Sequence, residues 1–241
     1  MSQNRSTAVM QRRIEPHDSL DDFPTPPWAT RALVQHVLIG GGFRADTLAA
    51  MSSREPCCNR GYMAKPMAET FKSVEATDIF PYGYGETADY LSMARQSLVD
   101  FTIFNPPFRL AEQFIQRGLE TSRVGVAVFA RASFYEGIQR YRRLFQPRRP
   151  TFYAPFSERV ILVKGRLLDP DRQYPKIDAK TGEVKRDPKT GEIILARPST
   201  ATSYAWFVWL KDTHIIGRTE SVLIPPCRRL LTRPGDYPEA E

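Results

Sequence analysis

Short apolar runs bounded by turn residues recur along the chain, and amphipathic stretches separate them. Val124–Phe129 is the clearest run, and its continuous apolar character is typical of a strand buried on both faces of a sheet. Leu48–Ser52 is a weaker strand candidate, because alanine and serine occupy most of it. Further strands are expected at Ser73–Ile79, Phe101–Phe104, Val160–Val163 and Ala205–Leu210.

Helical spacing of apolar positions marks three of the intervening stretches. Pro26–Leu38 begins with two prolines, which suit a first helical turn, and the glycines at 40–42 end it. Leu110–Gly118 and Glu136–Phe145 are the other predicted helices. Because helices alternate with short apolar strands, the pattern predicts an α/β fold with a mostly parallel sheet.

The two ends and one internal segment have a different composition. Residues 1–22 are polar and are expected to be flexible. A polar insertion at about 169–200 contains the near repeat DAKTGE and DPKTGE, which is a good turn sequence and predicts a surface hairpin or loop. The tail from Ile224 to Glu241 is rich in proline and arginine. The remainder, within 23–241, is expected to form one domain.

Composition narrows the class of protein. The chain has 241 residues, of which 41% are hydrophobic, and no apolar run approaches the roughly 20 residues needed to span a bilayer. The polar N-terminus lacks a signal peptide, so we expect a soluble cytoplasmic protein without membrane contact. Three cysteines and three scattered histidines show no metal-ligand spacing, so no metal is expected.

The net charge of +7 favours a polyanionic partner, because lysine and arginine release counterions from phosphates. Basic residues gather between 131 and 166, with aromatic residues among them. This pattern fits a nucleic-acid surface or a solvated helix face about equally well. The candidate nucleic-acid contacts are Arg140, Arg142, Arg143, Arg148 and Arg149.

The sequence Asn105-Pro106-Pro107-Phe108 follows an expected strand directly. Methylation of an aromatic amine needs hydrogen-bond acceptors for the NH2 group, because its lone pair is otherwise delocalised into the ring. The Asn105 side chain and the Pro106 carbonyl are such acceptors, and two prolines remove two competing N–H donors. Phe108 offers a face on which an extruded base can stack. We therefore predict Asn105 to Phe108 as the catalytic loop.

Acidic residues precede this loop at the ends of other expected elements. Glu55 opens a tight turn, Asp78 ends a strand about 20 residues later, and Asp89 lies beside Tyr90. A carboxylate at the position of Asp78 can accept hydrogen bonds from ribose hydroxyls. Asp89 can bind the exocyclic amine of an adenine ring.

With these motifs in this order, the chain resembles class I S-adenosylmethionine-dependent DNA N6-adenine methyltransferases, in particular small phage- or prophage-like ones. The resemblance extends from Asp22 to about Tyr237. It implies a doubly wound, mostly parallel, seven-stranded Rossmann-like sheet with an antiparallel final strand. It also implies S-adenosyl-L-methionine as cofactor, DNA as substrate and a prokaryotic or phage-encoded cytoplasmic enzyme.

The resemblance assigns cofactor contacts residue by residue. The segment from Asp22 to Arg31 looks like the N-terminal cofactor motif, and Glu55 to Gly61 looks like the first cofactor loop, with Asn59 where the family usually has glycine. Asparagine tolerates positive φ better than other non-glycine residues. The implied cofactor contacts are Thr25, Pro26, Glu55, Pro56, Cys57, Asn59, Gly61, Asp78, Ile79, Asp89 and Tyr90.

Other functions fit the same residues. RNA adenine, DNA cytosine N4 and a protein glutamine amide all present a planar NH2 group, so the catalytic loop does not separate them. RNA is expected less than DNA. A different class of protein, a degenerate nucleic-acid-binding protein with a weakened cofactor site, is the further alternative. The sequence does not indicate an oligomeric state.

Overall fold

The structure is a computed structural model that describes residues 21–93, 96–178, 181–213 and 217–238. Of the segment predicted to be flexible, 1–22, only Asp21 and Asp22 lie within the described residues. Among the helices in these ranges, none is long and apolar enough to span a membrane.

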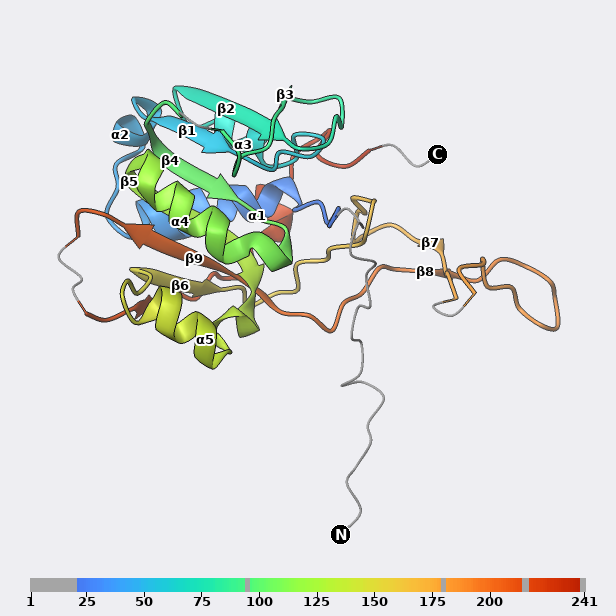
Figure 1. Cartoon of the computed structure of the whole chain (residues 1–241). Coiled ribbons are helices and arrows are strands. Elements are labelled where there is room, and N and C mark those ends of the chain that lie inside the picture. Colours follow the sequence, from blue (N-terminus) through green and yellow to red (C-terminus); the bar gives the residue numbers. More distant parts are fainter. Residues whose placement is uncertain (1–20, 94–95, 179–180, 214–216, 239–241) are drawn as a thin grey trace, which may run out of the picture.

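Ten strands and ten helical segments make up the described part of the chain (Figure 1). The strands are β1 Ser52–Glu55, β2 Ser73–Asp78, β3 Glu86–Thr87, β4 Val99–Phe104, β5 Ser122–Arg131, β6 Phe152–Pro155, β7 Tyr174–Pro175, β8 Leu195–Ala196, β9 Tyr204–Leu210 and β10 Glu220–Ser221. The helical segments are α1 Pro27–Ala32, η2 Leu33–Ile39, α2 Ala45–Ala49, α3 Ala64–Ala68, η3 Phe108–Leu110, α4 Ala111–Thr121, η4 Ala132–Tyr135, α5 Ile138–Arg140, η5 Tyr141–Phe145 and α6 Arg228–Leu231.

Eight strands form one sheet in the order β10-β6-β9-β5-β4-β1-β2-β3. Strands β3, β2, β1, β4 and β5 are mutually parallel, and β9 runs antiparallel between β5 and β6. The predicted doubly wound, mostly parallel sheet with an antiparallel strand is thus confirmed. The sheet has eight strands where seven were expected, and the antiparallel strand β9 is not the last, because the short strand β10 follows it in the chain and pairs parallel to β6 at the edge.

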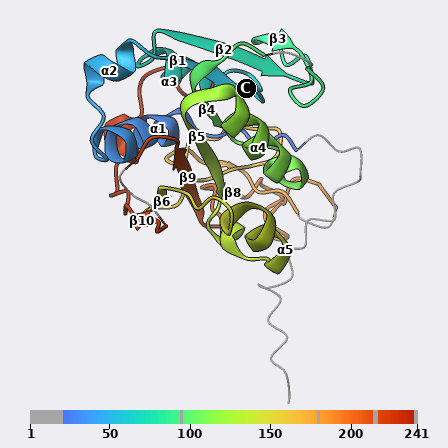
Figure 2. The ribbon, with the colours of Figure 1, turned by 60° about the vertical axis from the view of Figure 1, so that its left-hand side comes forward.

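Apolar side chains bury both faces of the sheet. On one face, α1, η2, α2 and α3 pack over a core that includes Trp28, Phe101 and Trp206. On the other face, α4 and η5 cover a second core around Phe104 and Phe207. Figure 2 shows α1 and α4 on opposite sides of the sheet. Burial on both faces explains why the central strands read as continuous apolar runs.

The first strand lies further along the chain than predicted. Leu48 belongs to helix α2, and the strand β1 spans Ser52–Glu55. Its sequence is polar, and two of its side chains pair with β2: Ser53 Oγ donates to the Ser73 carbonyl (3.1 Å), and Arg54 Nη2 donates to Glu75 Oε2 (2.7 Å). A strand with its polar groups paired in this way gives no apolar pattern to detect.

The predicted strand Val160–Val163 was also wrong. The partner of β9 on this side is β6, Phe152–Pro155, which pairs with it antiparallel from Phe152↔Val208 to Pro155↔Ala205. Val160–Val163 instead lies in irregular chain, with Val160 and Leu162 buried in the first core. Apolar character here reports burial and not strand pairing.

The insertion at 169–200 stands away from the body, on the side toward which β4 points (Figure 1). No described residue of this segment is buried. Three backbone hydrogen bonds close a ring between positions nine residues apart: Lys176 N–H to Ile194 O (2.8 Å), Lys185 N–H to Lys176 O (2.8 Å) and Ile194 N–H to Lys185 O (2.9 Å). Matching bonds follow in the described residues of the two repeats, where Gly182 N–H donates to Asp178 O (2.9 Å) and Gly191 N–H donates to Asp187 O (2.8 Å).

A buried ion-pair cluster joins α1 to the C-terminal tail. The Arg31 guanidinium donates to Glu69 Oε1 (2.8 Å) and to Asp236 Oδ2 (2.6 Å), and it also donates to the Leu231 carbonyl (2.7 Å). The side chains of Arg31 and Asp236 are only 9% and 7% exposed. Removing the cation would leave the Asp236 carboxylate without its counter-ion in a largely desolvated position, whereas Glu69 keeps its pair with Arg233 (2.9 Å).

We expect Arg31→Met to lower the free energy of unfolding by about 3–5 kcal/mol, because an uncompensated buried charge remains. Urea denaturation of both proteins measures this difference. Arg44→Met is the matched control, since the Arg44–Asp46 pair is 78% and 63% exposed and surface pairs contribute little. Equal destabilisation by the two substitutions would contradict the structural role of the Arg31 cluster.

Candidate functional site

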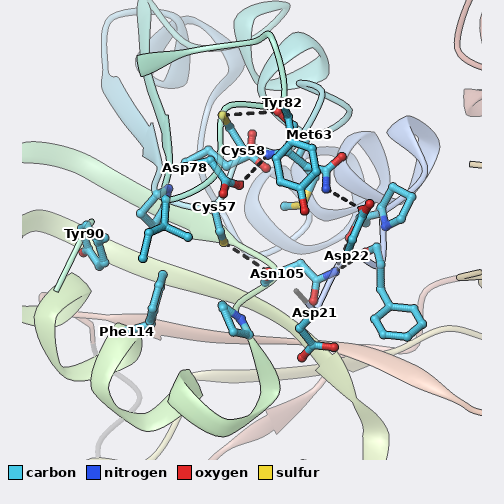
Figure 3. A pocket seen from close by; sticks show the side chains of 18 of the residues that line it. Asp21, Asp22, Cys57, Cys58, Met63, Asp78, Tyr82, Tyr90, Asn105 and Phe114 are labelled. Carbon is cyan, nitrogen blue, oxygen red and sulfur yellow. Dashed lines mark hydrogen bonds between the residues drawn. The ribbon is translucent and has the colours of Figure 1, made fainter. Parts of the chain in front are cut away.

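A pocket of about 790 Å³, including its open mouth, lies at the carboxyl ends of β1, β2 and β4 (Figure 3). Parallel strands bring the residues that follow them to one edge, where α/β sheets place their ligands. The lining residues are Asp21, Asp22, Phe23, Pro24, Thr25, Glu55, Pro56, Cys57, Cys58, Asn59, Tyr62, Met63, Asp78, Ile79, Tyr82, Asp89, Tyr90, Asn105, Pro107, Leu110 and Phe114.

Asn105 lines this pocket directly after β4, and its amide orientation is defined. Its Nδ2 donates to the Phe23 carbonyl (2.9 Å) and to Thr25 Oγ1 (3.0 Å). Both amide protons thus have acceptors, while no group among the described residues donates to Oδ1. The side chain therefore offers the pocket a hydrogen-bond acceptor and not a donor.

The rest of the predicted catalytic loop divides between the pocket and its rim. Pro107 lines the pocket, whereas Pro106 is buried behind it and Phe108 is 48% exposed. The Phe108 N–H donates to Asp21 Oδ2 (2.7 Å), and the Arg131 guanidinium lies 5.2 Å from the centre of the Phe108 ring. A half-exposed aromatic ring beside a cation is a suitable platform for a base outside the pocket.

Two carboxylates lie deep in the pocket, at the ends of adjacent strands. Glu55 is 1% exposed, and burial together with the charge of Asp78 raises the pKa of its carboxyl well above the usual value. Its Oε2 is buried without a hydrogen-bond partner among the described residues. Burial, and then the nearby Asp22 charge, also raises the pKa of Asp78, although Asn59 N–H (2.9 Å) and Phe80 N–H (3.0 Å) donate to it.

The loop between β1 and α3 connects this acidic centre to the catalytic loop. The Cys57 thiol donates to the Asn105 carbonyl (3.1 Å; Figure 3). Burial raises the pKa of Cys57 and raises that of Cys58 to about 12, so both remain neutral thiols. Gly61 has φ 80°, and a Cβ there would lie 2.7 Å from the Tyr84 ring, so this position requires glycine.

Asn59 has φ 49°, as its place in the loop suggested. Its side chain is fully engaged: Nδ2 donates to Asp22 Oδ1 (2.7 Å), and Oδ1 accepts from the Arg60 backbone N–H (2.8 Å). The sequence identified no partner for this amide. The structure shows that the side chain belongs to a hydrogen-bonded network at the pocket wall.

The other implied cofactor contacts are placed unequally. Thr25, Pro56 and Ile79 line the pocket, but Pro26 and Gly61 do not. The remaining pair, Asp89 and Tyr90, also lines it. The Asp89 carboxylate accepts from Leu91 N–H (3.0 Å) and from the Ser92 hydroxyl, and these bonds, Ser92 first, hold its pKa below the usual value.

The five candidate arginines lie outside the pocket, on and after α5 and η5. Two of them pair with Glu112 at the start of α4: Arg143 Nε lies 2.9 Å and Arg140 Nε 3.6 Å from its carboxylate. Arg140 also donates to the Phe134 carbonyl (2.8 Å). The other three, Arg142, Arg148 and Arg149, are exposed and form no ion pair within the described residues.

Sequence reasoning missed several pocket residues. The segment before α1 contributes Asp21, Phe23 and Pro24 as well as the expected Thr25. Phe114 enters from α4, and Tyr82 from the loop after β2. No periodicity marks these positions, because their proximity comes from the folding of loops around the sheet edge. The adjacent acids Asp21 and Asp22 were the one feature of the sequence that could have indicated that this segment reaches the pocket.

No family model matches the sequence, and no curated protein matches it. Solved structures do match its fold. A candidate RNA methyltransferase from Pyrococcus horikoshii aligns with a TM-score of 0.51 over 83% of this chain and 91% of that one, at 13% identity. A type I restriction-modification methyltransferase subunit from Streptococcus thermophilus aligns with a TM-score of 0.52 over 82% of this chain and 46% of that one, at 10% identity. The chain has a methyltransferase fold.

The buried carboxyl of Glu55 makes stability depend on pH. In the folded protein Glu55 keeps its proton above pH 4.5, the ordinary pKa of glutamate, where the unfolded chain loses it. Its contribution to stability is therefore complete below that pH and is lost as pH rises. We expect Glu55→Gln to stabilise the protein progressively more between pH 5 and 8, measured by urea denaturation. A constant difference across this range would contradict the raised pKa.

Proposed function

We propose that this protein is an S-adenosylmethionine-dependent methyltransferase that acts on an exocyclic amine, N6 of adenine in DNA. The observation that carries the proposal is the orientation of Asn105. Its Nδ2 is held by the Phe23 carbonyl and Thr25 Oγ1, which leaves Oδ1 as an acceptor at the pocket wall. An amine donating to this oxygen has its lone pair less delocalised into the ring and is a better nucleophile.

The charge of the pocket supports S-adenosylmethionine as its ligand. Five carboxylates line it, from Asp21, Asp22, Glu55, Asp78 and Asp89, and the lining contains no basic residue. S-adenosylmethionine carries a sulfonium and an ammonium against one carboxylate, so this surface favours it electrostatically. The unpartnered Glu55 Oε2 fits a buried ammonium donor, and Asp78 fits ribose hydroxyls. When bound, the cofactor supplies the electrophilic methyl group.

The chain's own residues would then orient the reaction. Asn105 would position the amine, because its Oδ1 can accept a hydrogen bond from one N–H of that amine. Burial raises the pKa of the Cys57 thiol, so it stays protonated and donates to the Asn105 carbonyl. Phe108, half exposed at the rim, would stack on a base withdrawn from its helix.

The surface outside the pocket supports a nucleic acid as substrate. Arg142, Arg148 and Arg149 are exposed without ion pairs in the described part of the chain, and the whole protein has a net charge of +7. The fold shared with a restriction-modification methyltransferase subunit favours DNA. The fold shared with a candidate RNA methyltransferase keeps RNA adenine as the second candidate.

Cytosine N4 and a protein glutamine amide present the same amine chemistry, and the arginines weigh against the second of them. A degenerate protein with a weakened cofactor site is disfavoured by Asn59, because its positive φ is accommodated and its amide has a partner in Asp22.

We expect Asn105→Ala to lower the turnover number about a hundredfold or more, because it removes an acceptor used mainly in the transition state. Its affinity for S-adenosylmethionine should change little. Transfer of tritiated methyl groups to genomic DNA that lacks adenine methylation measures the first quantity, and calorimetry the second. Turnover near that of the wild type would refute the assignment of Asn105.

Asp78→Ala should weaken S-adenosylmethionine binding by roughly 1.5–3 kcal/mol, the range for hydrogen bonds to charged groups. Calorimetry on wild type and variant measures the difference. Asp171→Ala is the control, because Asp171 is exposed and lies outside this pocket. If the two variants bind the cofactor equally well, Asp78 is not a cofactor contact.

Replacing Arg142, Arg148 and Arg149 together with glutamine should weaken DNA binding and reduce the slope of log K against log salt. Each arginine that neutralises one phosphate of a duplex accounts for about 0.9 of this slope. Fluorescence anisotropy with a duplex at several salt concentrations measures it. The matched control is Arg44→Gln, an exposed arginine paired with Asp46. An unchanged slope in the triple variant would mean that the nucleic acid binds to another surface of the protein.

A further inference from the structure

We propose that Asp22 to Thr25 form a positioning strap that holds the Asn105 side chain in its acceptor orientation, and that Asn59 anchors this strap to the cofactor loop. This inference rests on the proposed function. It assigns positioning roles to residues in front of α1 and gives a reason for asparagine at position 59.

The strap binds the catalytic loop through its own backbone and one hydroxyl. The Phe23 carbonyl and Thr25 Oγ1 receive the two amide protons of Asn105, at 2.9 and 3.0 Å. Thr25 is 2% exposed, so water does not compete freely for this contact. Just before the strap, Asp21 Oδ2 accepts from the Phe108 N–H (2.7 Å). Both ends of the Asn105 to Phe108 loop are therefore attached to one short segment.

The strap binds the cofactor loop through Asp22. Its Oδ1 accepts from Asn59 Nδ2 (2.7 Å), and its carboxylate also pairs with the Arg60 guanidinium (3.2 Å). The Asp22 backbone carbonyl accepts from the Gly165 N–H (2.8 Å), which gives the strap a third attachment. Glycine at position 59 would accept the positive φ equally well but could not reach Asp22.

The orientation of Asn105 decides what the site can do. An amide rotated by 180° about its last side-chain bond would present NH2 in place of oxygen, and a donor facing the donor hydrogens of an amine repels it. In the observed orientation Nδ2 donates to both groups of the strap. In the rotated one the amide oxygen would face the Phe23 carbonyl oxygen, which can only accept and therefore repels it, whereas the Thr25 hydroxyl can accept or donate. A displacement of the strap would therefore reduce turnover without removing any group that contacts the cofactor.

The test compares isosteric and conservative variants. Thr25→Val removes the hydroxyl that accepts from Asn105 and keeps the shape of the side chain, whereas Thr25→Ser keeps the hydroxyl. Asn59→Gly removes the side chain that anchors the strap. Asp22→Asn keeps an oxygen that can accept from the Asn59 amide. We expect Thr25→Val and Asn59→Gly to lower kcat roughly tenfold and to change KM and Kd for S-adenosylmethionine by a clearly smaller factor. Thr25→Ser and Asp22→Asn should each retain most of the wild-type kcat. Tritium transfer to adenine-unmethylated genomic DNA and calorimetry supply these values.

A second measurement does not depend on activity. The side-chain amide protons of Asn105, identified by their loss in Asn105→Asp, give nuclear magnetic resonance signals whose exchange with water reports their hydrogen bonds. Exchange should quicken in Thr25→Val and Asn59→Gly and stay slow in Thr25→Ser.

Each outcome decides the proposal. Unchanged exchange in Thr25→Val and Asn59→Gly overturns the strap, and so does a loss of cofactor affinity equal to the loss of kcat, which indicates a general structural role. If wild-type protein methylates no nucleic acid, the proposed function fails, while the exchange measurement still decides whether the strap orients Asn105.

Discussion

The concentration of negative charge at one edge of the sheet is the constraint to which the rest of the site responds. Glu55 and Asp78 end two strands that pair in register, and neither has a basic side chain beside it in the pocket. Burying carboxylates without cations is unfavourable, so Glu55 retains its proton at pH values where it would ordinarily be charged. Such an arrangement lowers stability and is useful when a cationic ligand enters the pocket. Burial, and then the nearby carboxylates, raise the pKa of the neighbouring thiols, which stay protonated.

The loop from Asn105 to Phe108, proposed to be catalytic, places a neutral side chain beside these carboxylates. Asn105 is neutral, and its usefulness depends on which end of its amide faces the pocket. The strand β4 brings it to the edge, and two prolines remove backbone donors that would otherwise compete for the same space. Only the contacts from Phe23 and Thr25 select the orientation. The sheet thus fixes where Asn105 lies, and a loop far away in the sequence fixes the orientation of its amide.

The sequence could predict which residues the strands bring to the edge of the sheet, but not the contacts that loops make there. Asn105, Asp78 and Glu55 follow or end strands, so local patterns placed them correctly at a shared edge, and β5 and β9 were recognisable as apolar runs. The strand β1 was misplaced because its polar side chains are paired across strands, and β6 was missed while a buried irregular segment was taken for its equivalent. Apolar pattern reports burial, and it does not distinguish a strand from irregular chain. Contacts such as Asn59 to Asp22 join residues with no periodic relation, so no local pattern reveals them.

Asn59 shows how such a contact changes an interpretation. Considered alone, a side chain where related loops have glycine suggests crowding of the pocket and a failing cofactor site. In the structure the backbone adopts φ 49°, which asparagine tolerates, and the amide donates to Asp22 while accepting from the Arg60 N–H. The cost of positive φ in a non-glycine residue is offset by bonds that glycine cannot form. The residue that departs from the expected pattern thus links the loop beneath the acidic pocket to the segment that orients Asn105.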